Sequence, residues 1–322
     1  MREKIVKLLY CAQDFVSGEE LSEKLNVSRA AVWKHIKELR AEGGEIEAHT
    51  RRGYRLKRLP DLLKPEYVEL YEKLPDVHFV WMEETDSTNE EAKRAARDGA
   101  PEKSVFVAEH QTRGKGRLGR GWDSQRGEAV EMSVLLRPRF APNKAPAITF
   151  AAALGLLSAV KRICGVKAQI KWPNDIVYEG KKLCGILTEM SSDMDHVEYI
   201  VCGMGLNVNQ KDFPDGVKER AISLRMITGE RLDRQEISAA LIHDVFMYCE
   251  RYIEEGIGCI FDEYCKNSVI IGKEILILCG SEEMTGVCEG FSEDGSIVVR
   301  TEQGLREFCA GEVSIRGAGV YI

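Results

Sequence analysis

A stretch rich in glycine and arginine carries the strongest chemical signal of the sequence. It spans Glu109–Trp122 and reads EHQTRGKGRLGRGW, with four glycines interleaved with cations. Glycine at this density lets backbone N–H groups approach a ligand closely, and cations on the same loop add charge-assisted hydrogen bonds to phosphate or carboxylate. The stretch matches neither the Walker loop nor the dinucleotide-binding fingerprint. Taken alone, it fits an anion-binding loop and a flexible basic surface loop equally well.

Polar residues also mark two further segments. Asp86-Ser87-Thr88-Asn89 lies between the predicted strand Phe79–Met82 and a predicted helix, so these side chains either cap the helix or bind a ligand. Ile170–Tyr178 predicts a strand that is broken at Pro-Asn-Asp and then resumes. Such an interruption is too polar for the middle of a strand pair without a purpose. We expect the Asn174 amide and the Asp175 carboxylate at the sheet edge, where they can hold a ribose, a metal ion or an amine.

Apolar and alternating segments predict the elements that position these motifs. In chain order they are the strands Val105–Ala108 and Met132–Leu136, the buried helix Ala147–Cys164, a turn at Glu179-Gly180 into Lys181–Leu187, the strand Ile200–Val208 and the long helix Asp233–Glu255. After Asn267 the pattern changes to short strands. These are Glu274–Leu278, Thr285–Phe291, Ser296–Arg300 and Leu305–Cys309, with turns at Gly280-Ser281 and Asp294-Gly295. They predict a small SH3-like β-barrel.

The composition is that of an ordinary globular protein. With 322 residues, 44% hydrophobic and 30% charged, the chain is long enough for two or three domains with a buried core. No apolar run is expected to reach membrane-spanning length, and the N-terminus lacks a cleavable apolar core. A cytoplasmic protein with no membrane partner is therefore expected. The ten cysteines form no C-x-x-C pair and have no histidine at zinc-like spacing, which predicts buried reduced thiols and no resident metal.

Charge is distributed unevenly along the chain. Residues 1–58 contain thirteen Lys and Arg against nine Asp and Glu, whereas the whole chain has a net charge of −7. From Lys24 to Arg58 the balance is ten basic residues to four acidic ones. A basic module on an acidic body is typical of a nucleic-acid-binding domain.

The pattern of this basic segment predicts a winged helix-turn-helix. Its elements are helices over 2–13 and about 19–25, a third helix from its N-cap Ser28 to Gly43, and a wing over Glu45–Leu56 that turns at Arg51–Gly53. Val32, Ile36 and Leu39 of the third helix face the core, so its other face can enter a major groove. The residues expected to contact DNA are Ser28, Arg29, Ala30, Trp33, Lys34, Lys37, Arg51 and Arg52. A winged helix that binds protein is the alternative.

Five motifs together resemble those of one family. They are DSTN at 86–89, GKGRLGRGW at 114–122, KWPND at 171–175, KLCGIL at 182–187 and GMGLN at 203–207. Their order and spacing are similar to those of the biotin protein ligases, and the basic head is similar to that of the members that also repress biotin genes. The resemblance covers nearly the whole chain, and the motifs in register are far more specific than any one of them.

The resemblance implies an α+β protein with three domains. These are a winged helix-turn-helix DNA-binding domain at 1–60, a central mixed α/β ligase domain of the biotin/lipoyl ligase type at 65–266, and an SH3-like C-terminal domain at 267–322. It also implies a reaction in two steps. Biotin and ATP, with Mg²⁺, give biotinyl-5′-adenylate, and a lysine of a biotin carboxyl carrier protein then attacks the mixed anhydride. The adenylate would also favour a homodimer that binds operator DNA.

The resemblance assigns the site residues as well. Catalytic roles belong to Lys182, Arg117 and Asp175, because cations must neutralise the approach of a carboxylate to the α-phosphate and Asp175 would orient the attacking amine. The residues expected to bind biotin are Ser87, Thr88, Asn89, Gln111, Lys115, Gly116, Arg117, Lys182 and Gly185. Those expected to bind ATP or the adenylate are Gly114, Arg117, Arg120, Trp122, Asn174, Asp175 and Asn207. Magnesium would arrive with ATP.

Two positions depart from the family pattern. Lys115 stands where the loop commonly has arginine, which keeps the charge but loses the bidentate geometry. Glu131 stands where an aromatic residue is usual, which changes the packing beside the expected biotin pocket.

Three functions remain open from the sequence: an enzyme that doubles as a repressor, a ligase whose head no longer regulates, and a non-enzymatic biotin-sensing repressor. Lys182 and Arg117 argue against the last of these. A lipoate–protein ligase would share the fold, but it is not expected to combine the KWPND and GKGRLGR motifs with this head.

Overall fold

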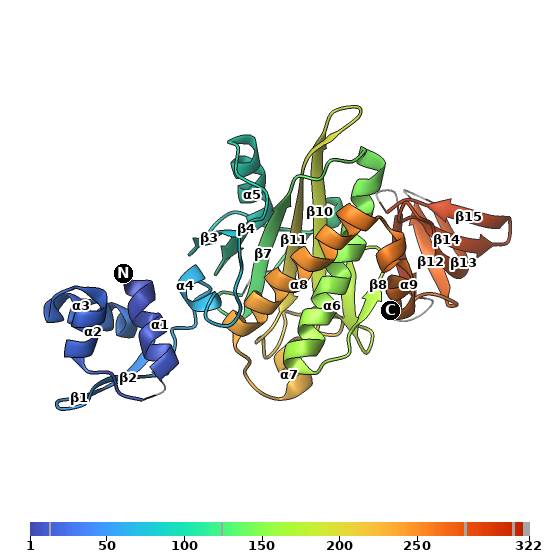
Figure 1. Ribbon diagram of the computed structural model, residues 1–322. Helices are drawn as coiled ribbons and strands as arrows, with labels where there is room; N and C mark the ends of the chain where they lie inside the picture. The colour runs from blue at the N-terminus through green and yellow to red at the C-terminus, as the bar shows by residue number, and fades with distance from the viewer. Residues whose placement is uncertain (13, 124, 280–281, 311–312, 318–322) are drawn as a thin grey trace. The chain divides into compact units, whose positions relative to one another are not determined.

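The computed structural model describes residues 1–322 except 13, 124, 280–281, 311–312 and 318–322 (Figure 1). The turn expected at Gly280-Ser281 therefore lies outside the described residues. The chain divides into two compact units. The first unit comprises residues 1–75 and 233–239, and the second unit comprises residues 76–232 and 240–322.

The first unit is the winged helix-turn-helix that the sequence predicts. Its elements are α1 (Arg2–Ala12), α2 (Gly18–Leu25), α3 (Arg29–Ala41), the antiparallel wing strands β1 (Glu45–His49) and β2 (Gly53–Arg58), and α4 (Pro65–Val68). The hydroxyl oxygens of Ser17 and Ser28 accept hydrogen bonds from backbone N–H groups and so cap α2 and α3. Val32, Ile36 and Leu39 are buried in one apolar cluster, as predicted. The opposite face of α3 therefore remains exposed.

A seven-stranded mixed sheet forms the centre of the second unit. Its order is β3-β4-β7-β11-β10-β9-β8. The strands are β3 (His78–Met82), β4 (Ser104–Ala108), β7 (Ala129–Leu136), β8 (Gln169–Lys171), β9 (Asp175–Tyr178), β10 (Lys181–Ser192) and β11 (Val197–Asn207). β3 and β4 pair in parallel, and the other neighbouring strands of this sheet pair antiparallel. β7 is buried along its whole length, because helices cover both faces.

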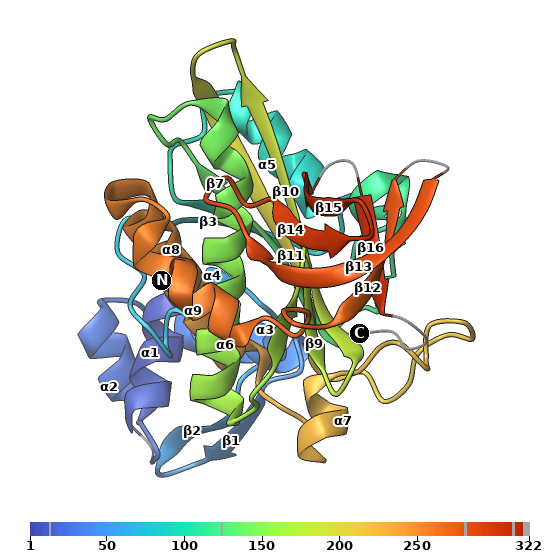
Figure 2. The same ribbon diagram turned by 90° about the vertical axis from the view of Figure 1, so that its right-hand side faces the viewer.

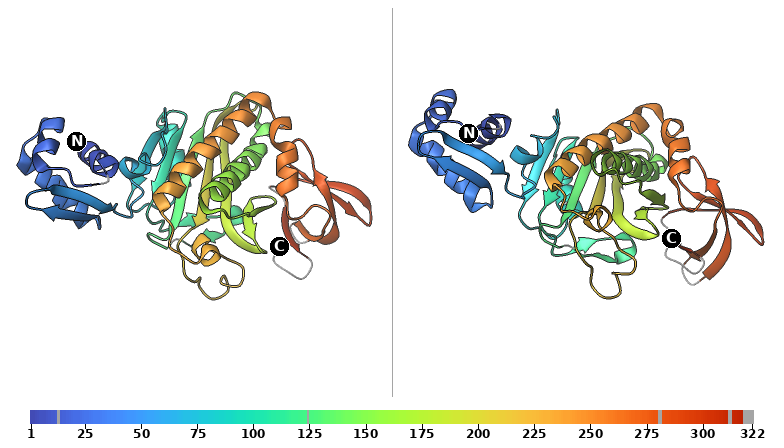
Figure 3. Two further views of the ribbon diagram at one scale, coloured as in Figure 1. Left: turned by 60° about the horizontal axis from the view of Figure 1, so that its bottom comes forward. Right: turned by 90° about the horizontal axis from the view of Figure 1, so that it is seen from below.

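Three helices cover the two faces of the sheet. They are α5 (Thr88–Arg97), α6 (Ile148–Cys164), which continues the short helix η2 (Pro142–Ala147), and α8 (Arg234–Glu255). α5 packs Ala92 and Ala96 against one face. α6 and α8 lie together on the other face (Figures 1 and 3), where a Cβ atom on Gly155 of α6 would lie 2.6 Å from Cα of Val245. The absence of a side chain at Gly155 therefore allows α8 to contact α6 closely.

The C-terminal part of the second unit is a small antiparallel β domain, as predicted (Figure 2). α7 (Leu224–Thr228) and α9 (Gly258–Asn267) precede its strands β12 (Glu274–Cys279), β13 (Glu282–Phe291), β14 (Ile297–Thr301), β15 (Gly304–Phe308) and β16 (Val313–Gly317), in the order β15-β14-β13-β12-β16. The sequence analysis missed β16. The buried Trp172 of the KWPND motif donates its indole N–H to the Gly295 carbonyl at 3.0 Å. This bond connects the β13–β14 turn to the central sheet.

The segment Ile170–Tyr178 differs from the expectation. It was predicted as one strand interrupted by polar residues, and that prediction is wrong. β8 and β9 pair antiparallel with each other, with Ile170 opposite Ile176 and Lys171 opposite Asp175. The residues Trp172-Pro173-Asn174 therefore reverse the chain instead of interrupting it, since they form the end of a tight hairpin.

The structure also differs from the expectations for the longest apolar helix and for the cysteines. Pro142–Cys164 is long and apolar enough to cross a membrane, with a mean hydropathy of 1.6, although no run was expected to reach that length. Because 61% of the apolar 18-residue window within this segment is buried inside the protein, the segment has the character of a core helix. Among the ten free cysteines, Cys184, Cys202, Cys249 and Cys288 are buried, whereas Cys11 and Cys309 are exposed and the others lie between these classes.

A cluster of polar side chains joins α1, the end of α3 and α4 in the first unit. The Glu42 carboxylate accepts hydrogen bonds from Arg2 at 2.7 Å, from Lys64 at 2.8 Å and from the Tyr67 hydroxyl at 2.9 Å. Burial acts to raise the pKa of Glu42, but the hydrogen bonds from Arg2, Lys64 and Tyr67 outweigh it and lower the pKa to about 2. The ionised carboxylate is therefore the form that the folded unit favours.

This cluster should make the first unit sensitive to acid. Because the pKa of Glu42 is lower in the folded state, its contribution is present above the unfolded value of 4.5 and is lost as the pH falls toward about 2. Urea titrations of the full-length chain, followed by circular dichroism from about pH 6 to about pH 2, should show a flatter pH dependence for Glu42→Gln than for wild type. The exposed Glu45 on β1 provides the control substitution Glu45→Gln. Identical pH profiles for wild type and Glu42→Gln would contradict this role.

Candidate active site

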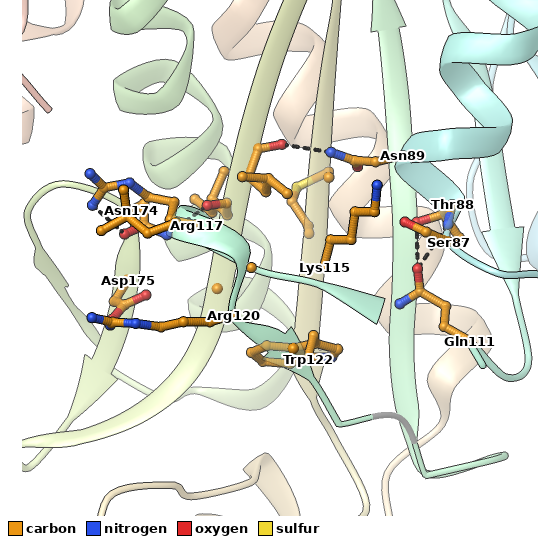
Figure 4. A pocket seen from close by; sticks show the side chains of 18 of the residues that line it. Ser87, Thr88, Asn89, Gln111, Lys115, Arg117, Arg120, Trp122, Asn174 and Asp175 are labelled. Atoms are coloured by element: carbon orange, nitrogen blue, oxygen red, sulfur yellow. Dashed lines mark hydrogen bonds between the residues drawn. The ribbon is translucent and has the colours of Figure 1, made fainter. Parts of the chain in front are cut away.

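A pocket in the second unit collects most of the predicted ligand-binding residues (Figure 4). Residues of α5, β10 and β11 contribute to its lining. All nine residues predicted to bind biotin line it, as do five of the seven predicted for ATP or the adenylate. Those five are Arg117, Arg120, Trp122, Asn174 and Asp175. The structure therefore brings together motifs that are about a hundred residues apart in the chain.

The floor of the pocket is a part of the sheet that carries small side chains. Paired residues on antiparallel strands point to the same face, so the pairing of β10, β11 and β7 defines rows across the floor. One row is Gly185, Gly205 and Glu131, and the next row is Leu187, Gly203 and Ser133. The three glycines have no side chains, so other parts of the chain approach the backbone of β10 and β11 directly. The Asn89 amide lies over Gly203, and the Trp122 ring lies over Gly185 and Gly205.

Neutral polar groups gather at one end of the pocket. The backbone N–H and the hydroxyl of Thr88 donate to Oε1 of Gln111 at 2.8 and 3.2 Å. The Ser133 hydroxyl lies 2.6 Å from Oδ1 of Asn89, and the Asn89 amide donates to the Leu187 carbonyl at 3.1 Å. Ser87 occupies the N-cap position of α5, but its side chain makes no capping hydrogen bond. The geometry therefore does not support helix capping as the purpose of Ser87.

Arg117, Arg120 and Asp175 lie at the other end, whereas the Lys115 side chain lies beside Thr88 and Asn89, as Figure 4 shows. Lys182 Nζ lies 2.7 Å from Oδ1 of Asp175. Arg117 donates to the Ala310 carbonyl, and its Nη1 lies 3.5 Å from Oδ1 of Asn174. Burial lowers the pKa of Arg117, with Arg120 adding to this effect and Asp175 opposing it. A guanidinium stays protonated in proteins even so, so Arg117 brings a positive charge to this end of the pocket.

The glycine-rich loop, Gly114–Trp122, forms one wall of the pocket. Its ends pair as the short strands β5 (Gly114–Lys115) and β6 (Gly121–Trp122), with the short helix η1 (Arg117–Gly119) between them. Lys115 Nζ contacts Oε1 of Glu90 on α5 at 2.5 Å. The hydrogen bonds from Lys115 and Lys93 lower the pKa of Glu90. Lys115, which departs from the family pattern, thus forms an ion pair that connects the loop to α5.

Two predicted residues do not line the pocket. Asn207 donates to the Ile222 carbonyl at 3.1 Å and accepts from Gln210 at 3.3 Å, so it supports the chain behind the pocket. Gly114 lies where a Cβ atom would be 2.6 Å from the Trp122 carbonyl oxygen, which explains the need for glycine there.

The sequence analysis also missed several residues that line the pocket. These are Leu118, Gly121, Ile186, Leu187, Gly203 and Met204. Leu187 and Gly203 lie on the same face as Gly185 and Gly205, respectively. The two-residue period of a strand, counted from the glycines of the KLCGIL and GMGLN motifs, was the signal that could have found them.

Comparisons with known proteins match both the winged helix-turn-helix and the domain that contains the pocket. Residues 1–55 match the HTH domain family, residues 81–207 match the biotin/lipoate A/B protein ligase family, and residues 270–316 match the biotin protein ligase C-terminal domain family. A solved biotin protein ligase from Aquifex aeolicus in complex with biotin and ATP is similar with a TM-score of 0.66 and 30% identity, covering 75% of this chain and 99% of that chain. The fold and the pocket together define a biotin protein ligase.

Relatives that match over nearly their whole length identify the family of the chain more specifically. It is 35% identical over 98% of its length to the bifunctional ligase/repressor BirA of Bacillus spizizenii and to that of Bacillus subtilis, each covered to 98%. The BirA of Escherichia coli is 27% identical, with 98% of this chain and 97% of that protein covered. The chain belongs to the family of bifunctional biotin ligase/repressors.

A side chain added at Gly203, on the floor of the pocket, should lower both stability and ligand binding. In Gly203→Ala, the Cβ atom would lie 1.9 Å from Oδ1 of Asn89, so the amide must move. Overpacking of this kind costs about 1–3 kcal/mol, and we expect a lower midpoint of thermal unfolding together with weaker biotin binding by calorimetry. Gly258→Ala is the control, because nothing lies within 4 Å of its Cβ position. Similar losses in both variants would show that Gly203 has no special role.

Proposed function

We propose that this pocket forms biotinyl-5′-adenylate from biotin and ATP and then transfers biotin to a lysine of a biotin carboxyl carrier protein. The same adenylate would act as corepressor for the DNA-binding head. The observation that carries the proposal is that the amide and hydroxyl groups of Thr88 and Gln111 lie at one end of the pocket and the guanidinium group of Arg117 lies at the other. Neutral donors and acceptors suit the ureido ring of biotin, and cations suit its carboxylate and the α-phosphate of ATP.

In the first step, a carboxylate oxygen of biotin attacks the α-phosphorus of ATP, and the bond to pyrophosphate breaks. Two anionic groups must approach each other, so the barrier is largely electrostatic. Lys182 and Arg117 would neutralise this charge. The 2.7 Å contact with Asp175 holds the Lys182 ammonium in place, and burial of Arg117 strengthens its field on a nearby anion.

In the second step, the lysine amine of the carrier attacks the carbonyl carbon of the mixed anhydride. The amide bond forms, the carbon–oxygen bond to AMP breaks, and the amine loses a proton. Asp175 would orient this amine, because its carboxylate lies at the Arg117 end of the pocket. The glycine-rich loop would exclude the water that otherwise hydrolyses the anhydride.

Magnesium is expected to enter with ATP. Over the residues that the structure describes, no group of three His, Cys, Asp or Glu side chains could hold a metal ion. The side-chain oxygens of Asn174 and Asp175 nevertheless line the pocket, and Mg²⁺ binds through one or two such oxygens together with phosphate and water. These two residues would therefore hold the ion, which would neutralise phosphate charge.

Loss of the Lys182 ammonium should slow adenylate formation severely. Removal of one donor at a developing charge costs about 3 kcal/mol, or roughly a hundredfold in rate. Pyrophosphate release with biotin and ATP should therefore drop by about that factor in Lys182→Ala. Lys181→Ala is the matched control, because Lys181 is the neighbouring residue on β10 and does not line the pocket. Pyrophosphate release near the wild-type rate in Lys182→Ala would refute the catalytic role.

The exposed cations of the first unit support the DNA-binding half of the proposal. All eight residues predicted to contact DNA are exposed. Trp33 is 56% exposed, and Lys37 Nζ lies 5.5 Å from its ring centroid. Arg29 pairs with Glu19 at 2.9 Å and Arg52 pairs with Asp14 at 3.0 Å. Exposed pairs of this kind are worth little, so phosphates can replace the carboxylates.

A repressor of this type would act as a homodimer. Two heads must meet two half-sites about one DNA turn or a multiple apart, and the adenylate would favour the dimer by population shift. We place the protein in the cytoplasm, with the carrier protein and operator DNA as its partners and no membrane. We also retain the three-domain division 1–60, 65–266 and 267–322.

The head should show salt-dependent and ligand-responsive DNA binding. In a mobility-shift titration on the promoter of the biotin genes, the Kd for DNA should fall when biotin and ATP are added. The double substitution Lys34→Ala and Lys37→Ala should reduce the salt slope by about 0.9 for each phosphate that is no longer neutralised, whereas Lys4→Ala, an exposed lysine on α1, should leave it unchanged. Absence of sequence-preferring binding by the full-length protein would leave a ligase with a non-regulatory head.

A further inference from the structure

A buried carboxylate lies directly behind the pocket wall. Glu131, which stands at the position where an aromatic residue was expected, is 2% exposed in the middle of β7. Its Oε1 accepts a hydrogen bond from the indole Nε1 of Trp122 at 3.2 Å. Trp122 lines the pocket and Glu131 does not. Its hydrogen bond with Trp122 therefore connects Glu131 to a residue of the pocket lining.

The row of residues beneath Trp122 explains how its ring is held. A Cβ atom on Gly205 would lie 2.5 Å from Cε2 of Trp122, and one on Gly185 would lie 3.1 Å from Cζ3. The ring thus occupies the space left by two missing side chains, and Glu131, the third member of the row, lies at its N–H edge. Lys182 Nζ lies 5.4 Å from the ring centroid, within the range of a cation–π interaction.

Trp122 also ends the glycine-rich loop. It pairs with Gly114 across β5 and β6, and the loop between these two residues carries Arg117 and Arg120. β7 is a central, fully buried strand. The hydrogen bond from Trp122 to Glu131 therefore connects the C-terminal end of the arginine-bearing loop to a buried interior strand of the sheet.

We propose that Glu131 is a positioning residue for the adenylate site. It holds the Trp122 indole on the Gly185–Gly205 floor and so sets the place of both the ring and the arginine-bearing loop. The inference rests on the proposed use of this pocket for biotinyl-5′-adenylate. A purely apolar aromatic ring at this position would pack against Trp122 without a hydrogen bond, whereas the carboxyl oxygen of Glu131 supplies a directional acceptor.

Removal of this acceptor has a clear chemical consequence. Glu131→Ala leaves the indole N–H without its acceptor, and a buried donor left unsatisfied costs about tenfold or more in an equilibrium constant. Glu131→Gln keeps an oxygen that can accept the same bond. The alanine variant should therefore weaken ligand binding, and the glutamine variant should restore most of it.

A double-mutant cycle tests the coupling. The probe is a non-hydrolysable sulfamate analogue of biotinyl-5′-adenylate, and its Kd and dissociation rate are measured for wild type, Glu131→Ala, Trp122→Phe and the double variant. Glu131→Ala should raise the Kd about tenfold in the wild-type background and less than about twofold in the Trp122→Phe background. Glu131→Gln should stay within about threefold of wild type.

The chain offers a matched control for general destabilisation. Trp81 donates its indole N–H to Oε1 of the buried Glu109 at 3.0 Å, and neither residue lines the pocket. Glu109→Ala should lower the midpoint of thermal unfolding without a tenfold change in Kd.

The possible results separate the two proposals. Additive effects of the Glu131 and Trp122 substitutions, or equal changes of Kd in Glu109→Ala and Glu131→Ala, would overturn the role of Glu131 alone. Failure of the wild-type protein to bind the analogue would overturn the assignment of the pocket, and this inference with it.

Discussion

The whole site depends on the absence of side chains from one patch of sheet. Gly185, Gly203 and Gly205 leave the backbone of β10 and β11 uncovered, and the Asn89 amide and the Trp122 ring occupy the space thus made available. These two groups come from α5 and from the glycine-rich loop. The floor therefore does more than admit a ligand, because it also brings the two flanking segments to their places. A sheet with ordinary side chains here would hold both segments several ångströms away.

The two ends of the pocket differ in the polar and charged groups that they carry. Buried amide and hydroxyl groups at the Thr88 end hydrogen-bond to one another, and the Asn89 amide also donates to the Glu189 carboxylate at 2.8 Å. At the Lys182 end, the Lys182 ammonium is paired with the Asp175 carboxylate, whereas Arg117 contacts the Ala310 carbonyl and the Asn174 amide oxygen. The neutral oxygens fix the position of Arg117 without cancelling its positive field. Desolvation then makes that field effective on an anion.

Much of the fold and the pocket could be predicted from the sequence, for identifiable reasons. Strongly periodic segments such as α3 and β11 follow from hydrophobic spacing, and motif spacing predicted which segments meet. The prediction of one interrupted strand at 170–178 was wrong, because local polarity cannot distinguish an interrupted strand from the β8–β9 hairpin. Motif membership also does not show what a side chain contacts, and the Asn207 amide donates to the Ile222 carbonyl. The partner of Glu131 depends on strand register, which no local pattern encodes.

The KWPND hairpin belongs to two domains at once. Within three successive residues it sends the Trp172 indole to the Gly295 carbonyl of the C-terminal β domain and the Asn174 side chain into the pocket. The β domain is thus not a removable module in the sense of protein engineering. Exchanging it for the corresponding part of a relative, or opening the chain at the β13–β14 turn to insert a tag, would disturb the geometry of the substrate site itself. Fusion points and chimera boundaries in this protein belong away from that turn.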